Sequence, residues 1–170
     1  MARLFLTVFG TGWSPFAPGT CASALITAIF CVLVLLGVSP RWVAAVMLIL
    51  ALHGSIVTVV FGDAFIAQLG NKDPGQLVSD EQAGQALVFA GIFWLIAAPP
   101  AGGTRELLIY ALTAFILFRV FDILKPPPVR QLEAIPGAWG VLLDDLGAGV
   151  YALIVHTIIW KAGWLKSLWA

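Results

Sequence analysis

The stretch "LLIYALTAFILFRVFDILKPPPVR" occupies residues 107–130 and decides the fold class. Residues 107–124 form a long apolar run, close to the roughly 20 residues that a helix needs to cross a bilayer. The run carries Arg119 and Asp122 and ends at Lys125, where three prolines stop a helix. Charged side chains at bilayer depth cost about 2.5 kcal/mol or more each. Their presence at the end of such a helix therefore predicts a polar site near one membrane surface.

The composition of the whole chain places it in the membrane. Of its 170 residues, 61% are hydrophobic and 11% are charged, whereas a soluble domain has about 25% charged residues. Mean hydropathy is +0.99. We therefore expect one integral membrane domain over residues 1–170, with the lipid bilayer as a partner. The formal net charge is zero and no basic run occurs, so no nucleic-acid partner is expected.

Five apolar segments are present, at residues 21–38, 42–62, 85–98, 107–124 and 140–160. The third is short for a crossing, so it is expected to be a tilted, partial or interfacial helix. No alternating pattern of ten-residue strands occurs, and open strands cannot span lipid. The predicted fold is all-α, an integral membrane bundle of about four to five membrane-embedded helices. The N-terminal apolar stretch is broken early by glycines and prolines, so we expect it to be retained.

Five crossings would divide the connections between two faces. Residues 10–20, the loop of residues 63–84 and residues 125–140 are rich in polar and turn residues, and all three fall on one side. The connections at 39–41 and 99–106 are plain and fall on the other. The sequence thus predicts a polar site at one membrane face. Lys and Arg counts are equal on the two faces, so they do not fix the orientation.

The acidic residues on that face form three clusters. Asp80 and Glu81 are adjacent, Asp122 lies one helical turn from both Arg119 and Lys125, and a third pair begins the last segment. Gathered carboxylates repel one another unless a cation compensates them, and hard oxygens suit Mg²⁺. The candidate metal ligands are Glu81, Asp80, Asp122, Asp144 and Asp145. Arg119, Lys125 and Lys72 are candidates to bind an anionic substrate.

Each cluster also has a structural interpretation. Arg119 and Asp122 could form an ion pair inside the bundle, Asp144 and Asp145 a solvated first helical turn, and Asp80 and Glu81 plain surface. The predicted coincidence of all three clusters on one face favours a functional site.

The turn "GTGWSPFAPGT" at residues 10–20 is a weaker candidate. Gly10, Thr11 and Gly12 could bring free backbone N–H groups to a phosphate, and Thr20 could cap the first long helix. The alternative is an interfacial turn that only leads into a helix. His53, His156, Cys21 and Cys31 lie in or beside apolar segments, where packing roles are expected.

Four motifs then match one known family in order: "GTGWSPFAPGT", "SDEQAG", "FRVFDILKPPPV" and "GVLLDDLGAG". The chain resembles the phosphatidylglycerophosphatase A family of bacterial membrane lipid phosphatases. The resemblance implies functional roles for seven charged residues, Asp80, Glu81, Arg119, Asp122, Lys125, Asp144 and Asp145. The resemblance also points to Asp73. The chain departs from the family pattern at Pro127, where the family usually has an aromatic residue.

The resemblance implies an activity as well. The expected reaction is Mg²⁺-dependent hydrolysis of phosphatidylglycerophosphate to phosphatidylglycerol in phospholipid synthesis, at the cytoplasmic face of the bacterial inner membrane. Asp145, Asp144, Asp122, Lys125 and Arg119 would be catalytic, and attack by water or by a carboxylate both remain open. The alternatives from other classes are a small ion or proton carrier and a structural subunit.

Overall fold

The computed structural model describes residues 2–71, 74–96 and 103–168, and these residues form helices and connections without a strand. The main helices are α2 (Pro18–Leu35), α3 (Pro40–Leu69), α4 (Ser79–Ile96), α5 (Thr104–Leu124) and α7 (Ala138–Ala162). Short elements complete the chain: α1 (Ala2–Leu6), η1 (Thr11–Trp13), α6 (Val129–Leu132) and η2 (Lys166–Leu168). The predicted all-α membrane bundle is confirmed.

Four helices of the described chain are long and apolar enough to cross a membrane, namely α2, α3, α5 and α7. They correspond to the first, second, fourth and fifth predicted segments. In α5 the helix ends at Leu124, directly before Lys125 and the three prolines, as the sequence predicts. The chain therefore has the helices that a multi-pass membrane protein needs.

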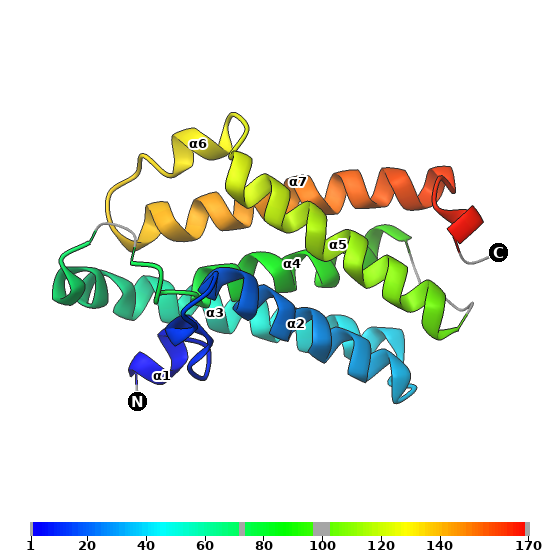
Figure 1. Ribbon diagram of the computed structural model, residues 1–170, viewed down its shortest axis with the longest axis horizontal. Helices are drawn as coiled ribbons and strands as arrows, with labels where there is room; N and C mark the ends of the chain where they lie inside the picture. The colour runs from blue at the N-terminus through cyan, green and yellow to red at the C-terminus, as the bar shows by residue number, and fades with distance from the viewer. Residues whose placement is uncertain (1, 72–73, 97–102, 169–170) are drawn as a thin grey trace.

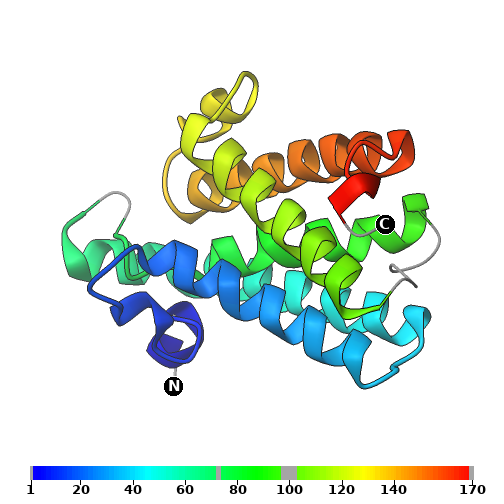
Figure 2. The ribbon, with the colours of Figure 1, turned by 45° about the vertical axis from the view of Figure 1, so that its right-hand side comes forward.

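The third predicted segment has a different character. Helix α4 begins at Ser79 rather than near residue 85, so Asp80 and Glu81 belong to its first turn. It packs against α2, α3, α5 and α7 and is buried along most of its described length. Figure 1 and Figure 2 show α4 in the middle of the bundle. The spanning helices surround this more polar helix and shield it from lipid.

Glycines allow α4 to approach its neighbours closely. A Cβ at Gly84 would press against the backbone oxygen of Asp145 and the ring of Phe118. A Cβ at Gly149 would meet the backbone oxygen of Gly84, and one at Gly54 would overlap that of Ser79. The polar first turn of α4 is therefore held against α3 on one side and α7 on the other.

The end of the bundle away from the acidic residues is aromatic. The rings of Tyr110 and His156 meet edge to face at 4.6 Å, and Trp160 stacks on His156. Both histidines have hydrogen-bond partners, because His156 Nε2 contacts Tyr110 O at 3.1 Å and His53 Nδ1 contacts a glutamine of α4 at 3.1 Å. The predicted packing roles of both histidines are confirmed, and both cysteines are free thiols.

The chemically rich connections meet at one end, as the sequence predicts. The N–H of Val78, before α4, donates to the oxygen of Leu6 at 3.0 Å. The N–H of Ala138, at the start of α7, donates to Asp63 Oδ1 of α3 at 2.7 Å. In Figure 1 the N-terminus, the end of α3 and the start of α7 all lie in the left half of the view. Lys72 and Asp73 fall outside the described residues.

Candidate active site

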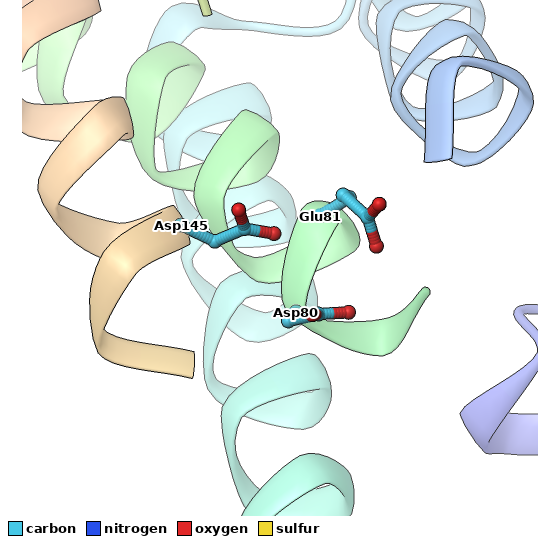
Figure 3. Close-up of side chains that lie close together, drawn as sticks. All are labelled: Asp80, Glu81 and Asp145. Carbon is cyan, nitrogen blue, oxygen red and sulfur yellow. The ribbon is translucent and has the colours of Figure 1, made fainter. Parts of the chain in front are cut away.

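Three carboxylates converge between α4 and α7. Asp80 and Glu81 come from the first turn of α4 and Asp145 from α7, and one oxygen of each lies within 4.8 Å of the others. Figure 3 shows the Asp145 carboxylate extending from α7 toward the two residues of α4. Asp80 and Asp145 are each only 4% exposed. We call these three residues the acidic triad.

The start of α4 is fixed by a contact with α3. The hydroxyls of Thr58 and Ser79 lie 2.6 Å apart, and both are fully buried. Gln82, one turn into α4, donates to the oxygen of Leu50 at 2.8 Å. These bonds fix the rotation of α4, which places the carboxylate of Glu81 against Gly19 in the first turn of α2.

Two members of the acidic triad keep buried oxygens without a donor among the described residues. Glu81 Oε2 and Asp145 Oδ2 are buried and accept no hydrogen bond from any residue that the structure describes. Burial raises the pKa of Glu81, a hydrogen bond with Asp80 lowers it, the charge of Asp122 raises it and that of Arg119 lowers it, with a net rise. Buried carboxylate oxygens without protein donors are what a hard divalent cation binds, so the set fits such an ion.

Arg119 lies at the edge of the triad. Its Nη1 contacts Asp122 Oδ2 at 2.7 Å, from one turn away on α5. A Cβ at Gly19, in the first turn of α2, would overlap Glu81 Oε1 and come within 3.3 Å of Arg119 Nη1. Gly19 thus allows α2 to begin directly against the triad and the guanidinium group.

Lys125 provides a second positively charged side chain at the same end. It follows the last residue of α5 in the left-handed conformation, with φ of 44°. Its Nζ contacts Asp144 Oδ2 at 2.5 Å and Glu133 Oε1 at 3.1 Å. Burial lowers the pKa of Lys125, but the hydrogen bonds and charges of Asp144 and then Glu133 outweigh this and raise it. The ammonium group is therefore charged at neutral pH.

The adjacent aspartates of α7 divide their contacts. Asp145 lies beside Asp80 and Glu81, whereas Asp144 binds Lys125. Asp144 Oδ1 also accepts the N–H of Asp145 at 2.9 Å. The structure thus brings together all seven charged residues singled out on α4, α5 and α7. It separates the seven into the acidic triad and two acid–cation pairs, Asp122 with Arg119 and Asp144 with Lys125, and Glu133 joins the second pair; we call these five residues the ion-paired set.

The N-terminal turn differs from its prediction. The N–H groups of Gly10, Thr11 and Gly12 already donate to the oxygens of Thr7 and Val8, so they are not free for a phosphate. The hydroxyl of Thr11 is likewise bonded to both oxygens, and Gly12 packs against the backbone of Gln76. The turn was wrongly expected to offer open donors, because its residues form a compact set of local bonds.

Thr20 also differs from its prediction. Helix α2 begins at Pro18, with Ala17 as the residue before it, so Thr20 lies within the first turn and does not cap the helix. In the same turn, Gly19 lies against Glu81 of the triad. Lys72, the remaining predicted substrate contact, lies outside the described residues.

Two further residues contribute at this end: Glu133, which was not predicted, and Asp63, a weaker candidate because it closes the second apolar segment on the polar face. Glu133 is the second partner of Lys125, and its signal was its place as the acidic residue of the loop after the prolines. Asp63 accepts the first N–H of α7 and so fixes the start of that helix. No sequence pattern connects Asp63 with residue 138, because they meet only in the folded bundle.

Comparisons with known proteins identify the family of the chain. The family model described as Phosphatidylglycerophosphatase A matches residues 4–160. A Bacteroides thetaiotaomicron protein named putative phosphatidylinositol-3-phosphatase is 34% identical over 160 residues, 92% of each chain. A Haemophilus influenzae phosphatidylglycerophosphatase A is 35% identical over 155 residues, covering 90% of this chain and 85% of the relative.

An Escherichia coli phosphatidylglycerophosphatase A is 27% identical over 155 residues, covering 87% of this chain and 77% of the relative. No solved structure matches the chain. The family model covers most of the chain, including every residue of the acidic triad and of the ion-paired set. The chain therefore belongs to the phosphatidylglycerophosphatase A family and is a lipid phosphatase.

Proposed function

We propose that this protein hydrolyses the terminal phosphate monoester of phosphatidylglycerophosphate, giving phosphatidylglycerol and inorganic phosphate during phospholipid synthesis. Two relatives named for this activity support the substrate. The observation that carries the chemistry is the acidic triad, three carboxylates from two helices beside one guanidinium group. We place the reaction at the cytoplasmic face of a bacterial inner membrane, as the family implies.

The proposal includes Mg²⁺ as the cofactor. Asp80, Glu81 and Asp145 would hold it, because their oxygens lie within 4.8 Å of one another and two of these oxygens have no donor among the described residues. When bound, Mg²⁺ offsets negative charge on a phosphoryl group and lowers the pKa of a coordinated water. Asp122 and Asp144, also predicted as ligands, are paired with Arg119 and Lys125 and so fit a supporting role better.

The two cations of the protein would bind the phosphate. Arg119 Nε is buried and donates no hydrogen bond to any described residue, so it remains able to bind a phosphate oxygen. Lys125 has three donors and contacts two carboxylates, which leaves one N–H for the substrate. Asp122 and Asp144 keep these cations in place when no substrate is bound. In the overall reaction one water is consumed and its oxygen appears in the released phosphate.

A second candidate substrate is a phosphoinositide with a phosphate at the 3-position. The relative from Bacteroides thetaiotaomicron carries a name of that kind and aligns with this chain over nearly its whole length. Both lipids present a phosphate monoester on a polar headgroup, so the same triad and cations would serve either. The headgroup, and not the phosphoryl chemistry, distinguishes the two candidates.

The deciding experiment uses purified protein in detergent. Phosphate release is measured from phosphatidylglycerophosphate, phosphatidylinositol 3-phosphate and phosphatidic acid, with Mg²⁺, with EDTA, and with Mg²⁺ restored. We expect the highest kcat/KM on phosphatidylglycerophosphate and complete dependence on the divalent ion. Preference for the phosphoinositide would replace the proposed substrate with the second candidate. Turnover that persists in EDTA would show that the proposed Mg²⁺ requirement is wrong. Ion flux in liposomes without phosphate release would favour a carrier.

A further inference from the structure

An apolar groove runs along the outside of the bundle between α2 and α5. It has a volume of about 370 Å³, and its walls include Ala24, Ala28 and Val32 of α2 and Leu108, Leu112 and Phe115 of α5. These two helices lie side by side in Figure 1 and Figure 2. Both are membrane-spanning helices, so the groove faces the hydrocarbon layer.

The groove exists because small and large side chains face each other. Ala24 and Ala28 are one helical turn apart and leave the surface of α2 low. Leu108 and Leu112, also one turn apart, are about half exposed and form the wall on α5. Its lining residues run from Ala24 to Val32 on α2 and from Leu108 to Phe115 on α5, about two helical turns on each helix, and all of its named walls are apolar.

On both helices the groove begins about one helical turn from residues at the edge of the active site. Ala24 lies one helical turn beyond Thr20, in the first turn of α2, and Phe115 lies one turn before Arg119 on α5. Gly19, at the start of α2, and Arg119, near the end of α5, approach each other closely at the active-site end of this helix pair. A phosphate bound at Arg119 would therefore carry its lipid tails to the entrance of the groove.

We propose that this groove binds an acyl chain of the lipid substrate while the headgroup phosphate lies at the acidic triad. This inference depends on the proposed lipid phosphatase function and assigns the tail-binding surface of that site. A helix of a second copy is the competing occupant, because small residues spaced by four favour helix association. The leucine wall on α5 argues against it, since a neighbouring helix would meet Leu108 and Leu112 before reaching the alanines.

The test blocks the groove midway and compares tail lengths. Ala28→Phe fills the groove two turns below Thr20, and Ala64→Phe makes the same change at an exposed alanine of α3 outside the groove. KM is measured for dipalmitoyl and dihexanoyl forms of phosphatidylglycerophosphate. Each methylene that loses its contact costs about a factor of four in affinity. We expect the KM ratio of dipalmitoyl to dihexanoyl substrate to rise about tenfold in Ala28→Phe and to stay constant in Ala64→Phe.

A second measurement needs no substitution in the groove. A phospholipid with a photoactivatable group in its acyl chain is crosslinked to the unaltered protein, and the labelled peptides are identified by mass spectrometry. Labelling of α2 and α5 at the groove, reduced by excess substrate, supports the proposal. Labelling confined to other helices, or an unchanged KM ratio in Ala28→Phe, overturns it.

The remaining outcomes are also decisive. If Ala28→Cys forms a symmetric disulfide dimer in membranes, a second copy occupies the groove and the proposal is wrong. If the unaltered protein releases phosphate from both substrates but neither labelling nor KM ratio follows the groove, the proposal fails while the phosphatase function stands. If the unaltered protein releases phosphate from neither substrate, the proposed function itself fails.

Discussion

The acidic triad and the ion-paired set lie at the same end of the bundle, yet their carboxylates are balanced differently. In the ion-paired set, Asp122 contacts Arg119 at 2.7 Å and Asp144 contacts Lys125 at 2.5 Å. In the triad, Glu81 and Asp145 each keep a buried oxygen without a donor among the described residues. The acids of the ion-paired set contact protein cations directly, whereas Glu81 and Asp145 keep oxygens that a ligand can bind.

This difference separates two tasks that the sequence alone did not separate. A buried carboxylate without a cation is costly, so a fold that keeps such groups together does so for a ligand. Asp122 and Asp144 instead position the positively charged side chains of Arg119 and Lys125 beside that ligand. The comparison therefore predicts large effects for the triad, intermediate effects for the cations and small effects at the outer edge of the ion-paired set.

The largest effect is expected for Asp145→Asn. It removes one negative charge from the triad while keeping the size of the side chain, so cation affinity and turnover both fall. We expect kcat/KM to drop by about 10²–10³-fold, the contribution of a single group that stabilises transition-state charge. Phosphate release and Mn²⁺ binding by calorimetry are both measured.

Asp63→Asn is the matched control for that change. Asp63 is exposed at the same end, and an asparagine oxygen still accepts the N–H of Ala138. We expect near-normal turnover and cation binding in this variant. If folded Asp145→Asn turns over as fast as Asp63→Asn, the triad is not the catalytic centre.

The second effect concerns the shape of the cation at position 119. Arg119→Lys keeps the charge but loses the planar group that can bind Asp122 and a phosphate together. We expect kcat/KM to fall about a hundredfold, with cation binding preserved, as measured by initial rates and calorimetry. Arg130→Lys, at an exposed residue of α6, should change neither quantity. Equal activity of the two variants would contradict a phosphate-binding role for Arg119.

The third effect tests the contact of α2 with the acidic triad and the ion-paired set, through Glu81 and Arg119. In Gly19→Ala the added Cβ overlaps Glu81 Oε1 and crowds Arg119, so both side chains must shift. We expect about a tenfold loss of kcat/KM, because displacing positioned groups by a fraction of an ångström weakens them strongly. Thermal stability should fall only modestly, because the helix preference of alanine over glycine, about 1 kcal/mol, offsets part of an overpacking cost of about 1–3 kcal/mol.

Gly75→Ala is the control for that variant. A Cβ at Gly75 makes only an ordinary contact with Pro18, at 3.7 Å. Its activity should match that of the unaltered protein. A Gly19→Ala variant with full activity would show that the start of α2 does not restrain the site.

The smallest effect is expected for Glu133→Gln. The pair with Lys125 spans 3.1 Å, but the Glu133 side chain is 45% exposed, so solvent screens it. Exposed ion pairs contribute about 1 kcal/mol or less, and Lys125 keeps Asp144. Turnover should change by less than about fivefold, measured under the same conditions as the other variants. A larger loss would place Glu133 with the catalytic groups instead of at their edge.

Hydropathy was sufficient to predict the spanning helices and the common end of the polar connections. The proline run after Lys125 also located the end of α5, because proline cannot continue a helix. Helix α4 was placed too late in the sequence, since Asp80, Glu81 and two glutamines obscure its start. Its burial depends on glycine contacts with α3 and α7, which are tertiary and leave no periodic signal in one segment.

The separation of the seven charged residues into two groups could not be predicted either. Adjacent aspartates on a helix point about 100° apart, so the sequence indicated that Asp144 and Asp145 have different neighbours. Which one meets Lys125 depends on the rotation of α7, fixed by the bond from Ala138 to Asp63. The N-terminal glycines were misjudged because glycine spacing does not reveal that the N–H groups are already bonded locally.

The central position of α4 has a consequence for how the protein enters the membrane during synthesis. A segment that begins Ser-Asp-Glu-Gln lacks the hydrophobicity to leave the translocon for lipid on its own. It would be retained at the channel until α5 and α7 emerge and cover it. Synthesis of the fold is then complete only when α7 covers α4, and a chain that ends before α7 would leave the polar first turn of α4 uncovered.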